Sequence, residues 1–258
     1  MNDPKGLLSS EQLPLVPNGT LNHNGTDPQE YPETHWHLVP FPAAKGAPFN
    51  ADNLATVNDH SFLDDAKFLE ARTAAESRWV DGSRDISWRL HVFLWAVHVA
   101  VSRNPSVNLI EFGTGKGYMA AACCTELVDD TDFSGRLFLF DTFQKGDQDL
   151  FYYSNNAEEV RRYFDVYDFV QVIEGQLPES FPRSEIASVG FVHVDLNSAQ
   201  AELLALREVS SVLDPNALIL FDDAGNPGCR PQLEVATGFA NSIGRPLLQL
   251  PTGQALIA

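Results

Sequence analysis

The stretch "VNLIEFGTGKGYMAAACC", Val107 to Cys124, joins an apolar run to three glycines on alternate positions and then to a second apolar run. The first run predicts a strand over 107–112, and the second predicts a helix over 117–128. Glycine lets the backbone turn sharply and approach a ligand without a Cβ in the way. Free amides at a helix N-terminus favour a carboxylate or phosphate. The stretch therefore predicts a strand–loop–helix unit whose loop binds a ligand.

Similar units follow along the chain. Further strands are expected over 136–141, 168–175, 189–196, 217–223, 246–251 and 254–258, and further helices over 157–164, 199–213 and 229–242. Helical periodicity also predicts helices over 62–80 and 85–103, upstream of the first strand. Strands that alternate with helices predict an α/β fold with a seven-stranded, mostly parallel sheet covered on both faces. Ligands of such sheets bind beyond the carboxyl ends of the strands.

Three regions are expected from the composition. Residues 1–50 are rich in Pro, Asn and Gly and predict a flexible arm, residues 51–104 predict helices packed on the core, and residues 105–258 form the core itself. The aromatic patch of the arm, residues 31–42, could pack on the domain or on a second copy in a homo-oligomer. His35 and His37 within it are a weak metal signal.

The balance of charge excludes some partners. The net charge of −18 argues against nucleic acid and anionic lipid, because Lys and Arg are too few to offset the repulsion. Three cysteines without a Cys-x-x-Cys pair predict neither a disulfide framework nor a zinc site. No secretory signal is apparent, and no apolar run approaches the roughly 20 residues of a membrane span. We expect a cytoplasmic protein with no membrane partner.

Polar residues end the second and third strands of the core. Asp141 could accept hydrogen bonds from both hydroxyls of a ribose, or it could cap the turn that follows; its position 24 residues after Gly117 favours the ribose role. The third strand leads into "EGQ", where Glu174, Gly175 and Gln176 are placed to flank an adenine ring.

Three aspartates end the next two strands. Asp195 lies at the end of one of them, and Asp222 and Asp223 lie at the end of the other, in "ALILFDDAG". Neighbouring parallel strands lie about 4.8 Å apart, so the three carboxylates can converge. Their mutual repulsion would be costly unless a proton or a cation compensates it. Mg²⁺ binds carboxylate oxygens and keeps positions open for substrate oxygens. A metal site is favoured over the alternative, in which one aspartate caps a helix and another faces water.

The glycine loop and the aspartates give the chain a resemblance to a known family. A dinucleotide-binding fingerprint, G-x-G-x-x-G, would need glycine at position 118, where this chain has Tyr118. The stretch "EFGTGKG", Glu111 to Gly117, instead resembles motif I of class I S-adenosylmethionine-dependent methyltransferases. "LDPNALILFDDAG" and "LPTGQALIA" are similar to the macrocin O-methyltransferase-like sugar O-methyltransferases, over roughly residues 85–258. This resemblance implies a Rossmann-like fold and two cofactors, S-adenosylmethionine and Mg²⁺. It implies a catalytic metal site at Asp195, Asp222 and Asp223, and cofactor binding by Glu111, Gly113, Gly115, Gly117 and Asp141. From their positions beside these residues and at the strand ends, we also expect the cofactor to be bound by Thr114, Tyr118, Thr142, Gly175, Gln176 and Asp195.

One departure concerns the general base. Family members often have Asp-x-Asp or a histidine where this chain has Asn197 and Ser198, and an amide cannot take up a proton at neutral pH. We therefore expect a hydroxylated acceptor, either a vicinal diol or a catechol, that a bound cation activates. Phe151, Tyr152 and Tyr153 could form a platform for it or simply pack a long loop. A metal-free or non-methylating reaction and a catalytically silent scaffold are the alternatives.

Overall fold

The computed structural model describes residues 49–56, 58–78, 85–128, 132–144 and 156–258. Before the sheet come β1 (Phe49–Ala51), β2 (Leu54–Thr56), the 3₁₀ turn η1 (Ser61–Asp64), α1 (Ala66–Glu76) and α2 (Ser87–Arg103). The core continues with β3 (Asn108–Phe112), α3 (Tyr118–Val128), β4 (Leu137–Asp141), α4 (Ala157–Phe164), β5 (Val170–Glu174), β6 (Val189–Val194) and α5 (Ala199–Ser210). It ends with β7 (Leu213–Phe221), η2 (Pro227–Cys229), α6 (Arg230–Ser242), β8 (Leu247–Gln249) and β9 (Ala255–Ile257).

The core sheet has seven strands in the order β5-β4-β3-β6-β7-β9-β8. The first five strands are parallel, and β9 pairs antiparallel with both β7 and β8. The chain runs outward from β3 through β4 to β5, and then returns to β6 on the other side of β3. This change of direction between β3 and β6 is the switch point at which open α/β sheets bind ligands. The predicted seven-stranded, mostly parallel sheet is confirmed.

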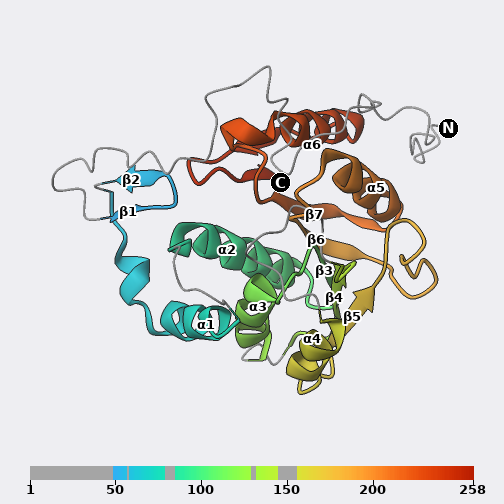
Figure 1. Cartoon of the computed structure of the whole chain (residues 1–258), viewed down its shortest axis with the longest axis horizontal. Coiled ribbons are helices and arrows are strands. Elements are labelled where there is room, and N and C mark those ends of the chain that lie inside the picture. The colour runs from blue at the N-terminus through green and yellow to red at the C-terminus, as the bar shows by residue number, and fades with distance from the viewer. Residues whose placement is uncertain (1–48, 57, 79–84, 129–131, 145–155) are drawn as a thin grey trace.

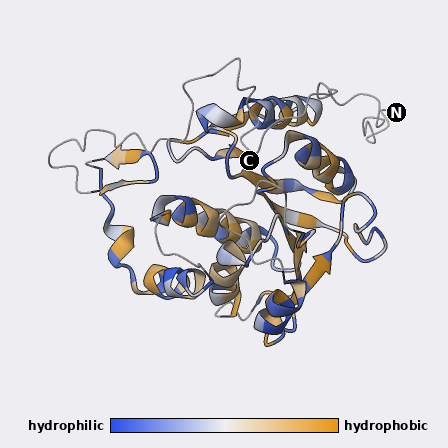
Figure 2. Ribbon diagram, viewed as in Figure 1, coloured by the Kyte–Doolittle hydropathy of each residue, from blue (hydrophilic) through white to orange (hydrophobic). Residues whose placement is uncertain are grey.

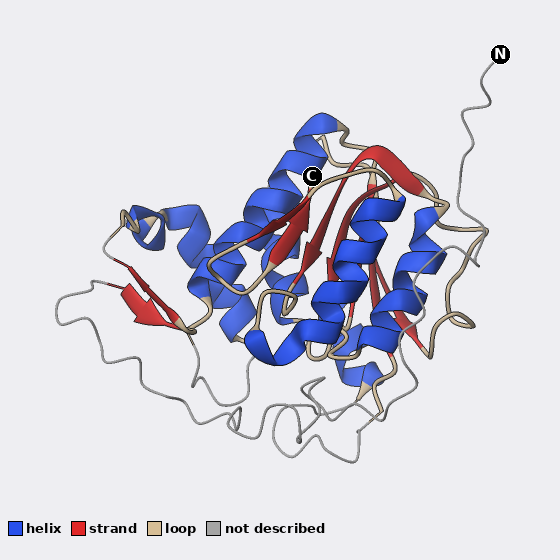
Figure 3. Ribbon diagram, turned by 90° about the horizontal axis from the view of Figure 1, so that it is seen from above, coloured by secondary structure: helices blue, strands red, loops and turns tan. Residues whose placement is uncertain are grey.

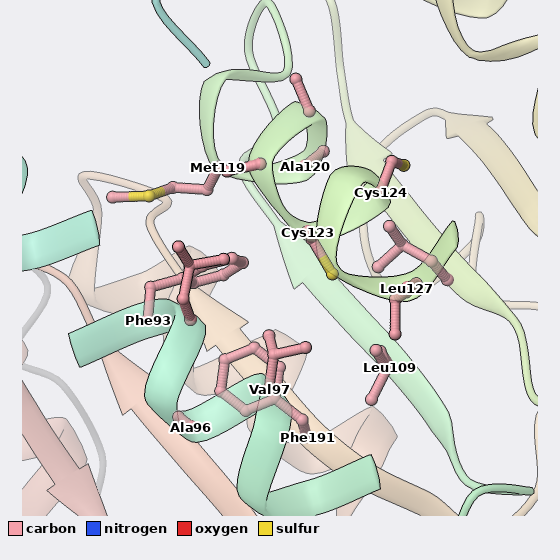
Figure 4. Packing of buried hydrophobic residues seen from close by; sticks show 14 of the residues in the cluster. Phe93, Ala96, Val97, Leu109, Met119, Ala120, Cys123, Cys124, Leu127 and Phe191 are labelled. Atoms are coloured by element: carbon pink, nitrogen blue, oxygen red, sulfur yellow. The ribbon is translucent and has the colours of Figure 1, made fainter. Parts of the chain in front are cut away.

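Helices cover both faces of the sheet, as Figure 3 shows. Because side chains alternate along a strand, Leu109 faces one hydrophobic cluster and Ile110 faces the other. The first cluster joins that face to α1, α2, α3 and α4, and the second joins the opposite face to α5 and α6. Figure 4 shows α2, α3, β3 and β6 meeting in the first cluster. Figure 2 shows both hydrophilic and hydrophobic residues on the helices, as expected of helices that pack one face on a sheet and expose the other.

Several predicted boundaries are wrong. The expected helix over 62–80 is divided into η1 and α1, because Asp65 takes an extended conformation (ψ 131°) and its side chain caps α1 at the backbone N–H of Phe68. The strand expected from residue 217 begins at Leu213, and the helix before it ends at Ser210. The β1–β2 hairpin was not expected. The arm, except for its last two residues, lies outside the described residues, together with the aromatic loop at 151–153.

Among the helices that the structure describes, none combines the length and apolar character needed to span a bilayer.

Candidate active site

The carboxyl ends of five parallel strands bring the predicted site residues to one edge of the sheet. Gly113 follows β3, Asp141 ends β4, Gly175 follows β5, Asp195 follows β6 and Asp222 follows β7. Backbone hydrogen bonds continue the pairing past the strand ends, from Asp195 N–H to the carbonyl of Phe112 (2.8 Å) and from Asp222 N–H to that of Val194 (3.0 Å). The glycine loop and the three aspartates therefore belong to one site.

The glycine loop has a backbone that favours glycine. Gly113, Gly115 and Gly117 all have positive φ angles, of 90°, 55° and 86°. A Cβ on Gly113 would lie 1.8 Å from the carbonyl oxygen of Asp195, and a Cβ on Gly117 would lie 2.5 Å from the Phe164 ring. Glycine is therefore needed at these two positions because the loop backbone lies very close to other parts of the protein. This close approach packs the loop against the end of β6 and against α4.

Asp141 organises the same loop. Its Oδ2 accepts a hydrogen bond from the Gly115 N–H and its Oδ1 accepts one from the Phe143 N–H, both at 2.7 Å. The second bond is the turn cap considered above as the alternative to ribose binding. Each carboxylate oxygen can accept two hydrogen bonds, so these two bonds do not by themselves exclude a ribose hydroxyl. The two roles are therefore compatible.

The remaining expected cofactor residues lie around this loop. Gly175 donates its N–H to the carbonyl of Asp141 at 3.0 Å, which places it and Gln176 next to the loop. Thr142 accepts a hydrogen bond from the Gln144 N–H at 3.4 Å, and Thr114 is buried within the turn. Tyr118 begins α3 and packs against the first hydrophobic cluster. Burial raises the pKa of its phenol.

The three aspartates converge as predicted. Asp195, Asp222 and Asp223 each offer one carboxylate oxygen, and these oxygens lie within 4.8 Å of one another. Asp222 is buried, whereas Asp195 and Asp223 are half-buried. Burial and the neighbouring carboxylates raise the pKa of Asp195 well above its ordinary value. The repulsion inferred from the sequence is therefore present in the fold.

A buried arginine partly compensates these carboxylates. The Nη1 of Arg89, in α2, donates hydrogen bonds to Asp222 Oδ2 (2.7 Å) and Asp223 Oδ1 (3.1 Å), and its Nε donates to Asp52 Oδ2 (2.5 Å). Arg89 is only 5% exposed. Burial would lower its pKa, but the three carboxylates raise it well above the ordinary value, so the guanidinium stays charged.

His193 links this cluster to the strand before the glycine loop. Its Nδ1 lies 3.0 Å from Glu111 Oε1, and its Nε2 lies 3.9 Å from Asp222 Oδ1, which is too far for a hydrogen bond but near enough for charge attraction. Burial lowers the pKa of His193, but the flanking carboxylates of Asp222 and Glu111 raise it to about 10. Despite burial, Arg89 and His193 hold the pKa of Asp222 well below its ordinary value.

Among the residues that the structure describes, the carboxylates of this network outnumber its cations. Its carboxylates are Asp52, Glu111, Asp195, Asp222 and Asp223, and its cations are Arg89 and His193. When every one of these described groups is ionised, the carboxylates exceed the cations by three charges. Oxygen ligands that converge with an excess of negative charge suit a hard divalent cation. The residues present therefore fit Mg²⁺ at Asp195, Asp222 and Asp223, although Arg89 competes for two of these side chains.

The two residues after the first of these aspartates occupy defined positions. Asn197 takes a left-handed conformation (φ 52°) and its Nδ2 donates a hydrogen bond to Asp195 Oδ1 at 3.4 Å. Ser198 is the N-cap of α5, where its hydroxyl accepts a hydrogen bond from the Ala201 N–H. Asn197 thus orients an aspartate, and neither side chain offers a base.

Sequence reasoning did not identify Asp52, Arg89, His193 and Gln254. Two of them carried a recognisable signal: Arg89 lies four residues before Phe93 on the apolar face of its helix, and His193 interrupts an apolar strand. Gln254, fully buried near the chain end, donates its Nε2 to Asp222 Oδ1 at 3.1 Å. Neither Gln254 nor Asp52 could be placed without the topology that brings β9 and the hairpin to this edge.

Comparisons with known proteins agree with this arrangement. A family described as a methyltransferase domain matches residues 110–224, which include the glycine loop, Asp141 and the three aspartates. Asp52, Arg89 and Gln254 lie outside the matched residues. No protein with a curated function matches the sequence.

Solved structures share the fold. The O-methyltransferase NovP is 17% identical, with a TM-score of 0.57, over 66% of this chain and 78% of NovP. The calicheamicin methyltransferase CalS11 is 16% identical, with a TM-score of 0.52, over 78% of this chain and 93% of CalS11. Its apo structure, described as a TDP-rhamnose 3'-O-methyltransferase, gives 17% identity and a TM-score of 0.51, over 78% of this chain and 95% of CalS11. At these identities the likeness establishes the fold alone.

Proposed function

We propose that this chain, which is a class I S-adenosylmethionine-dependent methyltransferase, transfers the methyl group to a hydroxyl oxygen of a small molecule with the help of Mg²⁺. The observation that carries the proposal is the convergence of Asp195, Asp222 and Asp223 at the strand edge that also holds the glycine loop. Similarity in fold to NovP and CalS11 supports oxygen as the acceptor atom and a sugar as one class of acceptor.

The chain's own residues would bind and orient the two cofactors. The loop at Gly113–Gly117 would receive the methionine part of S-adenosylmethionine, Asp141 the ribose, and Gly175 with Gln176 the adenine. Asp195, Asp222 and Asp223 would hold Mg²⁺. When bound, S-adenosylmethionine supplies an electrophilic methyl group, and Mg²⁺ supplies a positive charge that lowers the pKa of a bound hydroxyl. The role of the protein is positioning and electrostatics.

The acceptor is best matched by two adjacent hydroxyls. Such a pair can chelate a cation that three carboxylates leave partly open. Because Asn197 binds Asp195 and cannot act as a base, an acceptor whose hydroxyl is already acidic needs the least help. A catechol meets this condition, and so does a sugar diol once a metal acidifies it.

One observation favours a second candidate, a metal-free reaction. Arg89 donates to both Asp222 and Asp223 and so supplies a cation where the metal would lie. In that case the aspartates and Arg89 would form a fixed structural network. The acceptor would then be oriented by other groups at the same strand edge.

Calorimetry distinguishes the two candidates. S-adenosylmethionine is titrated into wild-type protein and into Asp222→Ala, each with Mg²⁺ and with a chelator, and Mg²⁺ is titrated separately into both metal-free proteins. The main proposal expects cofactor binding by both proteins and metal uptake by the wild type alone. Cofactor binding without metal uptake by the wild type would favour the metal-free reaction. No cofactor binding by the wild type would refute both.

The acceptor class is tested by product formation. Catechols, sugar diols and matched monohydroxylated compounds are incubated with protein, S-adenosylmethionine and Mg²⁺, and methylated products are detected by mass spectrometry. We expect products from compounds with two adjacent hydroxyls, and no product when the metal is chelated. Equal methylation of the monohydroxylated compounds would refute chelation of the acceptor.

A further inference from the structure

Arg89 is shared between the acid cluster and a part of the chain outside the core sheet. The β1–β2 hairpin lies at the edge of the domain beside α2 (Figure 1). Its turn residues Asp52 and Asn53 both have positive φ angles, of 51° and 61°, as a two-residue hairpin turn requires. The turn directs the Asp52 carboxylate to the Nε of Arg89. This carboxylate is only 6% exposed, so the hairpin contributes a buried charge to the site.

The Arg89 guanidinium uses different nitrogen atoms to contact the hairpin and the aspartates that follow β7. Its Nε is used by Asp52, and its Nη1 is used by Asp222 and Asp223. A planar guanidinium presents its N–H donors at fixed angles. The hydrogen bond from Nε to Asp52 therefore also fixes the direction in which Nη1 donates. Gln254 holds the other oxygen of Asp222 at 3.1 Å. The orientation of Asp222 is therefore set from two directions, by Arg89 in α2 and by Gln254 immediately before β9.

We propose that Asp52 and Arg89 are positioning residues for the metal: Asp52 anchors the guanidinium, and Arg89 orients Asp222 and Asp223 so that they bind a divalent cation together with Asp195. The inference rests on the proposed function, because it assumes that the cluster takes up a metal. It adds that the hairpin, which lies outside the residues matched by the methyltransferase domain family, is part of the active site.

The proposal predicts the direction of the effect of Asp52→Asn. The substitution keeps the shape and one acceptor oxygen but removes a negative charge from Arg89. The guanidinium then associates more closely with Asp222 and Asp223, and the cluster has one negative charge fewer to attract a cation. Both effects weaken metal binding. Loss of a partner behind a metal ligand typically costs about 10-fold or more in metal affinity, and we expect a change of that size.

Binding of Mn²⁺ tests the proposal without substrate or S-adenosylmethionine. Mn²⁺ prefers the same oxygen ligands as Mg²⁺, and its free concentration can be measured by electron paramagnetic resonance. The variants are Asp52→Asn and Arg89→Lys, which keeps the charge but cannot reproduce the two-sided guanidinium. The matched control is Asp64→Asn, an equal change of charge at an exposed residue of η1. Circular dichroism and thermal unfolding establish that each variant is folded.

We expect Asp52→Asn and Arg89→Lys to bind Mn²⁺ about 10-fold or more weakly than the wild type, and Asp64→Asn to bind it equally well. If Arg89→Lys does not fold, Asp52→Asn decides alone. Wild-type affinity in a folded Asp52→Asn would overturn the positioning role and leave the proposed function intact. Failure of the wild type to bind Mn²⁺ would overturn both the metal part of the proposed function and this inference.

Discussion

Arg89 donates a hydrogen bond from Nη1 to Asp222 Oδ2 over 2.7 Å, and this contact joins the helix before the sheet to the strand that carries the adjacent aspartates. It explains how two neighbouring carboxylates can be held so close together. We expect Arg89→Met to destabilise the protein by about 3–5 kcal/mol, because removal of one partner leaves buried carboxylates without a cation. Urea unfolding in the presence of a chelator measures the free energy of unfolding.

Arg72→Met is the control for this prediction. Arg72 also pairs with a carboxylate, that of Glu76 at 2.6 Å, but both side chains are partly exposed to solvent and lie one helical turn apart. Such exposed pairs contribute at most about 1 kcal/mol. Equal costs for the two substitutions would contradict the view that Arg89 compensates buried charge.

Asp141→Asn tests the cofactor site. The substitution removes the charge and one of the two acceptor oxygens that hold the N–H groups of Gly115 and Phe143. It also weakens any hydrogen bond to a ribose hydroxyl. A hydrogen bond to a charged group contributes about 1.5–3 kcal/mol, so we expect S-adenosylmethionine to bind roughly 10- to 100-fold more weakly. Calorimetry measures the dissociation constant.

Asp168→Asn provides the comparison, because Asp168 is exposed and lies before the amino end of β5, at the opposite edge of the sheet. Its effect on cofactor affinity should be negligible. A wild-type dissociation constant for Asp141→Asn would mean that Asp141 only caps its turn.

Gly113→Ala tests the packing of the glycine loop. An alanine Cβ would lie 1.8 Å from the Asp195 carbonyl oxygen, and the φ of 90° is strained for any residue with a side chain. Because backbone strain and steric overlap each cost about 1–3 kcal/mol, we expect a loss of about 3 kcal/mol or more in the free energy of unfolding.

Gly244→Ala separates the two contributions. Gly244 also has a positive φ, of 68°, but a Cβ there would meet no atom within 4 Å. Gly244→Ala should therefore lower the free energy of unfolding only by the cost of backbone strain, about 1–2 kcal/mol. Unfolding curves in urea compare the two variants, and a cost for Gly244→Ala as large as that for Gly113→Ala would show that the contact with β6 is unimportant.

Much of the site could be predicted because it follows from local order along the chain. Parallel strands end at a common edge, so Asp141, Asp195 and Asp222 had to lie there once the alternation of strands and helices was recognised. The glycines at 113, 115 and 117 were identified by their spacing. The reason for two of them differs from the one expected, since the backbone at Gly113 and Gly117 approaches Asp195 and Phe164.

The compensating charges depend on long-range contacts and could not be predicted in the same way. Arg89 and Asp222 are 133 residues apart in sequence, and Gln254 and Asp222 are 32 apart. An arginine on a helix is usually at the surface, and only the packing of α2 against β6 and β7 buries this one. The sequence indicated that compensation was needed, and the fold was required to show which residue provides it.

The buried carboxyl of Glu202 makes the free energy of unfolding depend on pH. It lies in the first turn of α5, only 3% exposed, and its Oε1 accepts a hydrogen bond from Gln232 Nε2 at 2.9 Å. Burial raises its pKa from 4.5 to about 8. The folded protein therefore keeps a proton that the unfolded chain releases. Its contribution to stability is complete below about pH 4.5 and is lost as the pH rises through 8.

Glu202→Gln removes this loss, because an amide keeps the acceptor oxygen and does not ionise. Relative to the wild type, we expect the variant to gain about 2 kcal/mol or more in the free energy of unfolding at pH 9 and almost nothing at pH 4.5, since one unit of pKa corresponds to about 1.4 kcal/mol. Urea unfolding across this range measures both proteins. Parallel pH profiles for the two proteins would show that the Glu202 carboxyl does not retain its proton in the folded state.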